Sequence, residues 1–182
     1  MTTTTLITAE EFGQMTFDTP VELVQGEVVE LSFANARHGM VCTNVAYLLG
    51  TLERESNGTK VVACGSGVIT RRDPDSVRGA DLLVVTRERL PGAEVPVGYF
   101  DVAPELIVEV VSPSDRWSDV IAKIAEYLQA GVQEAWIVDP EQKRIHVYHG
   151  DAEPRMFEAS AEVSSRALPG LQFNVDDLFR GV

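Results

Sequence analysis

The sequence predicts an α/β fold in which a mixed β-sheet is flanked by α-helices. Segments with the alternation typical of strands outnumber segments with helical spacing. One long helical segment, at about 115–130, joins two apolar strands at about 105–111 and 134–139. A helix between two such strands is the usual crossover of a parallel pair, whereas short turns join antiparallel pairs. Both kinds of pairing are therefore expected in one sheet.

The first half of the chain contains a hairpin, a helix and three strands. Thr8 and Glu11 have the spacing of a capping box, which predicts the start of a short helix. The stretch "ELVQGEVVEL" predicts an N-terminal β-hairpin around a turn at Gln25 and Gly26. Apolar residues recur at helical spacing over about 39–54, so one face of this helix should pack on the sheet. Strands are predicted at about 60–70, 81–86 and 105–111.

The second half begins with the helix at about 115–130, which should end at Gly131, a typical C-terminal capping residue. The strands "EAWIVD" and "RIHVYH" follow and are joined by a turn over 139–142. The stretch "LPGLQFNVDDLF" predicts one more strand and a terminal helical turn. No repeat, low-complexity segment or flexible linker divides the sequence. One domain over residues 1–182 is therefore expected.

Composition and charge exclude several classes of protein. The contents of 45% hydrophobic and 24% charged residues indicate a globular chain and not a disordered one. The start "MTTTTLITAEEF" does not resemble a signal peptide, and no stretch approaches the ~20 apolar residues of a membrane span, so a cytoplasmic protein without a membrane partner is expected. With three histidines and no zinc-ligand spacing, Cys42 and Cys64 are expected to be buried, reduced thiols.

Glu109 interrupts the apolar strand "LIVEVV", where each neighbour suits burial. Alternation places it on one face with Ile107, and a buried carboxylate requires a metal, a cation or a raised pKa. The same alternation places Asp81 at the start of another apolar strand, "GADLLVV". If the two strands are neighbours, their carboxylates converge on a site that suits Mg²⁺. Alternatively, Asp81 is a turn residue, and Glu109 is paired with an arginine or exposed on an edge strand.

Lys123 is the third candidate, on the helix at about 115–130. A step of 100° per residue places it beside the apolar arc of that helix, next to Tyr127. A lysine in this position could extend towards the sheet. The alternative is a lysine whose stem covers apolar surface while its ammonium group stays in water.

The stretch "PELIVEVVSPSDRWSDVIAKIAEYLQAGVQEAWIVDPEQKRIHVY", with "VELVQGEVVEL", "RHG" and "VRGADLLVV", resembles the Uma-type putative restriction endonuclease family. This family is a branch of the PD-(D/E)XK nuclease superfamily. The resemblance covers about 10–179, and the block "VEVVSPSDRWSDVIAKIAEYLQAGV" is its most specific part. It implies a restriction-endonuclease-like core at about 20–150, flanked by the hairpin and helices predicted above.

The resemblance also assigns candidate site residues. Asp81 and Glu109 match the two acidic positions of the motif, and the carbonyl of Val110 would be a third metal ligand. The motif lysine is replaced by valine two residues after Glu109, and Lys123 on the following helix is the matching position. Two further candidates also match family positions. They are Glu22 and His38, although Glu22 could simply end a hairpin strand and His38 could simply begin a helix.

Taken together, these residues and the resemblance imply an Mg²⁺- or Mn²⁺-dependent endonuclease acting on DNA, and the resemblance suggests a homodimer. The net charge of −13 argues against strong binding of a polyanion. Between Arg71 and Arg89, however, five arginines face four acidic residues, so a cleft there could still guide one phosphate. The alternative is a catalytically weak or inactive nuclease-fold module for binding or assembly, since a fold does not fix a function.

Overall fold

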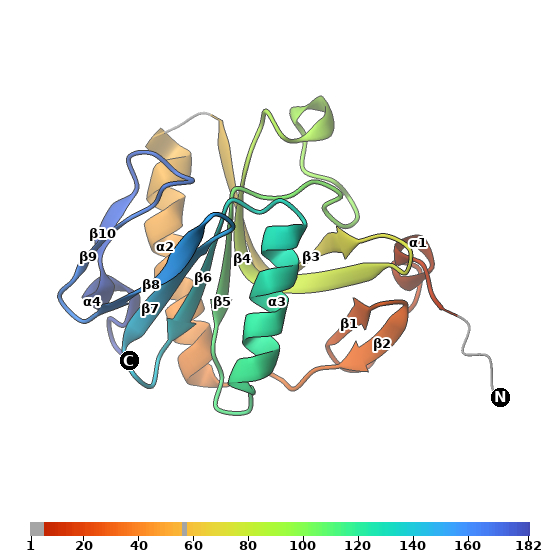
Figure 1. The fold of residues 1–182 in the computed structure, drawn as a ribbon, viewed down its shortest axis with the longest axis horizontal. Helices are drawn as coiled ribbons and strands as arrows, with labels where there is room; N and C mark the ends of the chain where they lie inside the picture. Colours follow the sequence, from red (N-terminus) through yellow and green to blue (C-terminus); the bar gives the residue numbers. More distant parts are fainter. Residues whose placement is uncertain (1–5, 56–57) are drawn as a thin grey trace.

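The computed structural model describes residues 6–55 and 58–182 (Figure 1). Its helices are α1 (Ala9–Phe12), α2 (Ala36–Glu55), α3 (Trp117–Gln129) and α4 (Val175–Leu178), with a short 3₁₀ helix, η1 (Pro91–Ala93). Its strands are β1 (Val21–Val24), β2 (Glu27–Glu30), β3 (Thr59–Arg71), β4 (Ser76–Thr86), β5 (Leu106–Val110), β6 (Glu134–Asp139), β7 (Arg144–His149), β8 (Ala152–Glu158), β9 (Glu162–Ser164) and β10 (Gln172–Asn174).

The main sheet confirms the predicted mixed pairing. Its strands run in the order β2-β1-β4-β5-β6-β7-β8, and β3 pairs with β4 outside this path. Strands β5 and β6 are parallel and are joined by α3, as expected of a crossover, whereas the other described pairs in the sheet are antiparallel. Strands β9 and β10 form a separate two-stranded sheet.

Strand β4 organises the part of the sheet where the candidate residues lie. Strand β3 pairs with it over nearly its whole length, with a register shift between Ala63 and Ser66. On its other edge β4 pairs with β5 through Leu82–Val84 and with β1 at Val77, because a strand has only two edges. Along this edge of β4, residues 78–81 therefore separate the position paired with β1 from the segment paired with β5.

Two apolar layers enclose the sheet, with α3 in front of the central strands and α2 behind them (Figure 1). Val41, Val45 and Leu49 recur at i, i+4 and i+8 on α2 and are fully buried against one face. Ile124 and Tyr127 of α3 are buried against the other face. No described helix combines the length and the apolar character needed to cross a bilayer.

Some element boundaries differ from those predicted. Helix α2 begins at Ala36, about three residues early, because Asn35 Oδ1 accepts a hydrogen bond from the His38 amide and caps the first turn. Strand β4 begins at Ser76, so Asp81 lies inside the strand and not at its start. Cys42 is only partly buried, and the side chain of Cys64 lies outside the described part.

Candidate active site

Glu109 lies near the end of β5, on the face covered by α3, and is 8% exposed. Its Oε1 accepts a hydrogen bond from the Tyr127 hydroxyl at 2.9 Å, and its Oε2 is 3.0 Å from Lys123 Nζ. Burial raises the pKa of Glu109 to about 7, although Lys123 opposes this increase. The buried carboxylate predicted from the sequence is therefore paired with a lysine and a tyrosine.

Lys123 reaches from α3 into the sheet, and its ammonium group has three acceptors. Nζ lies 3.0 Å from Glu109 Oε2, 2.9 Å from Glu22 Oε1 and 2.8 Å from the Gly79 carbonyl oxygen. Burial alone would lower the pKa of Lys123, but the two carboxylates outweigh it and raise this pKa above its usual value. The ammonium group is directed into the protein, so the alternative of a solvent-exposed lysine head is wrong.

Glu22 extends this network to the N-terminal hairpin, and it is 3% exposed on β1. Its Oε1 accepts a hydrogen bond from the Gly79 amide at 2.9 Å, and its Oε2 accepts one from Arg78 Nη1 at 3.0 Å. Arg78 also donates two hydrogen bonds to Glu126 Oε2. Burial opposes ionisation of Glu22, but Lys123, Arg78 and the Gly79 amide together lower the pKa of its carboxyl.

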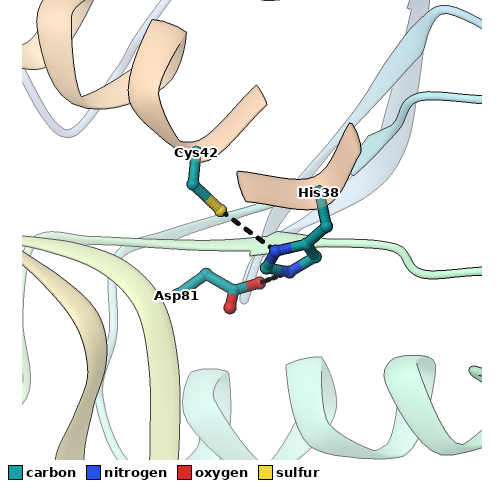
Figure 2. Close-up of side chains that lie close together, drawn as sticks. All are labelled: His38, Cys42 and Asp81. Atoms are coloured by element: carbon teal, nitrogen blue, oxygen red, sulfur yellow. Dashed lines mark hydrogen bonds and ion pairs between the residues drawn. The ribbon is translucent and has the colours of Figure 1, made fainter. Parts of the chain in front are cut away.

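Asp81 forms a second group of contacts with α2 (Figure 2). Its Oδ2 accepts a hydrogen bond from the Val110 amide at 2.7 Å and lies 3.1 Å from His38 Nε2. The other ring nitrogen, Nδ1, lies 3.5 Å from Cys42 Sγ, one helical turn further along. The hydrogen bond to Asp81, followed by the contact with Cys42, raises the pKa of His38 to about 10. The contact with Asp81 therefore favours the imidazolium form of His38 at neutral pH.

The pairing of β4 with β5 brings the two groups together. Leu82 lies opposite Val108, so the next position along the two strands sets Asp81 opposite Glu109. The two carboxylates are close enough for Asp81 to help raise the pKa of Glu109. The strands predicted to carry these residues are thus confirmed as neighbours.

Comparison with known proteins identifies the family. The model of the Uma2 family, described as "Putative restriction endonuclease", matches residues 9–176, which is most of the chain. The chain belongs to the Uma2 family. This membership supports a nuclease-type function and confirms the resemblance seen in the sequence.

A solved structure similar to this Uma2 chain shows the same fold. It is described as a putative nuclease belonging to DUF820 from Anabaena variabilis ATCC 29413. The TM-score is 0.81 at 21% sequence identity, and the match covers 96% of this chain and 98% of the other. A search of curated proteins gave no match.

The donor set of this Uma2 chain fits a hard divalent cation. Among the described residues, both hydrogen bonds to Asp81 fall on Oδ2, which leaves Oδ1 for a ligand bond. Carboxylate oxygens are the ligands that Mg²⁺ prefers. Four linked carboxylates exceed the three cationic side chains around them even with the imidazolium counted. The carboxylates are Glu22, Asp81, Glu109 and Glu126, and the cations are Lys123, Arg78 and His38.

The sequence predicted part of this network and missed the rest. Arg78, Glu126, Tyr127 and Cys42 were not predicted as site residues. Tyr127 could have been found, since it lies four residues after Lys123 and so on the same face of α3. No sequence signal identifies Arg78 as the link between β1 and α3, because that link depends on how the hairpin meets β4.

Proposed function

We propose that this Uma2 chain is an endonuclease that hydrolyses phosphodiester bonds of DNA and depends on Mg²⁺ or Mn²⁺. The observation that carries the proposal is the position of the Lys123 ammonium group, between Glu109 and Glu22 and beside the strand that carries Asp81. Two carboxylates and a lysine that meet at neighbouring strands are the parts needed for metal-assisted attack of water on a phosphate. Membership of the family supports a nuclease-type function.

The proposed metal ligands are Asp81 Oδ1, the Glu109 carboxylate and the Val110 carbonyl oxygen. A bound divalent cation supplies a water of lowered pKa and stabilises negative charge on the phosphate. Glu109 must be ionised to act as a ligand, and its neighbour Lys123 favours the ionised form. The Val110 amide holds Asp81 through Oδ2, which directs Oδ1 away from this hydrogen bond.

Lys123 is the proposed catalytic cation, which orients the attacking water or offsets charge on the phosphorane. Glu22 and the Gly79 carbonyl fix the position of its Nζ, so both act through Lys123. His38 similarly positions Asp81 through Nε2. In this assignment Glu22 and His38 are positioning residues. Asp81 and Glu109 bind the metal, and Lys123 acts on the water or the phosphate.

The second candidate is a nuclease-fold module that binds or assembles without cleavage, and the net charge of −13 favours it. A strongly acidic surface weakens contact with a polyanion, so the proposed enzyme would bind DNA weakly or only at the site. A homodimer and a cytoplasmic location stay predictions.

The test measures Mn²⁺-dependent nicking of supercoiled plasmid DNA. We expect wild type to nick, Glu109→Gln to be inactive and Lys123→Met to be slowed by about 10²-fold or more, as when one preorganised electrostatic group is removed. Lys143→Met is the matched control, because Lys143 is exposed and its Nζ contacts only the Val182 carbonyl among the described residues.

Folding must be checked for each variant, since Lys123→Met leaves the buried Glu109 without a cation and Glu22 with Arg78 alone. Melting curves set an assay temperature at which every variant is folded. If Lys123→Met matches wild type, the lysine assignment is wrong, and nicking that survives Glu109→Gln indicates a contaminating nuclease. If pure wild type cleaves no DNA with either metal, the binding module becomes the better description.

A further inference from the structure

His38 and Cys42 form a pair that the proposed hydrolysis does not use. They are separated by four residues on α2, so their side chains leave the helix on the same face. Cys42 Sγ lies 3.5 Å from His38 Nδ1, and the opposite ring nitrogen meets Asp81 (Figure 2). One donor atom from each of the three residues lies within 4.8 Å of the other two.

The spacing of this pair suits a borderline-soft cation. In a tetrahedral zinc site with ordinary Zn–N and Zn–S bonds, the nitrogen and sulfur ligands lie about 3.6 Å apart. The observed separation of 3.5 Å between His38 Nδ1 and Cys42 Sγ needs little adjustment to reach that value. Mg²⁺ binds thiolate and imidazole poorly, because these ligands prefer softer metals.

The contact between Asp81 and His38 is also typical of a histidine that binds a metal. Such histidines usually donate their second ring N–H to a carboxylate, which fixes the tautomer and the ring orientation. Here His38 Nε2 faces Asp81 Oδ2 at 3.1 Å, so Nδ1 is the nitrogen left for a metal. Asn35, His38 and Ser112 also line part of a surface pocket.

We propose that Cys42 Sγ and His38 Nδ1 bind a divalent cation of the Zn²⁺ class, with Asp81 holding the ring through Nε2. Binding replaces the thiol proton and the Nδ1 proton, which both leave to solvent. The sequence was expected to lack zinc-ligand spacing, and the proposal rests instead on the H-x₃-C pair of α2. A second cation so close to Asp81 would oppose Mg²⁺ at the hydrolytic site, and only this part rests on the proposed function.

Co²⁺ is the probe, because a thiolate bound to Co²⁺ gives a charge-transfer band in the near-ultraviolet. We expect reduced wild type to develop this band with one equivalent of Co²⁺, and Zn²⁺ to abolish it by displacement. Cys42→Ser should lack the band, and Asp81→Asn should weaken Co²⁺ binding by about 10- to 100-fold. The controls are Cys64→Ser, which alters the other cysteine, and Glu109→Gln, which alters the hydrolytic site, and both should keep the band.

No band in wild type, or a band that survives Cys42→Ser, would overturn the site. A band that disappears in Cys64→Ser would do the same. Inhibition of nicking by Zn²⁺ is then measured for wild type and Cys42→Ser, each relative to its own zinc-free rate. Equal inhibition would refute the antagonism with Mg²⁺. Binding of Co²⁺ needs no cleavage, so it can succeed even if the chain is not a nuclease.

Discussion

Glu109 illustrates, at the scale of a residue, how much of the site could be read from the sequence. Alternation along β5 predicted its burial, and the resemblance pointed to Asp81 and Lys123 as its neighbours. The hydrogen bond from Tyr127 was not predicted, since it depends on how far α3 is rotated against the sheet. A sequence predicts which face of a strand carries a group, whereas its partners depend on tertiary packing.

Tyr127→Phe should destabilise the protein by about 1–3 kcal/mol, the usual cost of leaving a buried polar group without its partner. The substitution removes only the hydroxyl that donates to Glu109 Oε1. Urea unfolding measures the free energy, with Tyr148→Phe as the control, because Tyr148 is only partly buried and no described hydrogen bond involves its hydroxyl. Equal unfolding midpoints for the two variants would contradict the prediction.

His146 on β7 should make the protein less stable in acid. Burial, and then Arg144, lower the pKa of His146, so the unfolded chain binds more protons as the pH falls below the ordinary histidine value of about 6.5. The contribution of His146 to stability is therefore full above that pH and is lost progressively as the pH falls from that value towards the lowered pKa. Between pH 7.5 and 5, the melting temperature of His146→Gln should fall less than that of wild type. A parallel decline in both proteins would count against it.

At the scale of elements, periodicity predicted α2, α3 and the apolar strands because each buries a regular face. It missed the first half of β4, because Arg78 and Gly79 do not look like strand residues. That half pairs with β3 through a long hairpin, and its glycines allow close approach: a Cβ on Gly79 would lie 3.1 Å from the Gly65 carbonyl oxygen. Strand β4 begins earlier than predicted because residues 76–80 pair with β3, and not because of their own strand propensity.

Two glycine substitutions should have opposite effects on stability. A Cβ on Gly67 of β3 would lie 2.4 Å from Tyr99 Cδ1, and this ring is held against Phe12, so Gly67→Ala should cost about 1–3 kcal/mol. A Cβ on Gly50 of α2 would have no neighbour within 4 Å, so Gly50→Ala should gain about 0.5–1 kcal/mol. Urea unfolding of both variants tests the pair. A stabilising Gly67→Ala would show that Tyr99 moves at little cost.

The whole molecule carries its charge unevenly, and the arginines that suggested a locally basic cleft are mostly neutralised. Arg72 contacts Glu10, Asp75 and Asp101, and Arg78 contacts Glu22 and Glu126. Arg89 is paired with Glu105. The sequence count of five arginines could not show this, because all the partners except Asp75 come from distant segments. Three of the five arginines are therefore offset by carboxylates and cannot be counted as free positive charge.

Added salt should stabilise the metal-free protein. The net charge is −13, so the excess acidic side chains repel one another in the compact state. Salt screens this repulsion, so the melting temperature should rise between low salt and about 0.2 M NaCl at pH 7.5. The same titration at pH 5, near the isoelectric point of about 4.6, is the control and should show a smaller rise. If the two increases are equal, the effect does not come from net charge.

The hairpin of β1 and β2 gives the whole molecule an unequal distribution of local stability. The described register ties β1 to β4 only at Leu23 and Val77, yet β1 carries Glu22 into the centre of the Lys123 network. Amide protons of β1 should therefore exchange with solvent through a smaller opening than those of β5 and β6, which pair with each neighbouring strand over several positions. Each such opening removes one carboxylate from Lys123 while the rest of the sheet stays folded. In that open state the lysine would keep only Glu109 and Gly79 as partners, so we expect the local stability of β1 to limit the fraction of time that the site is complete.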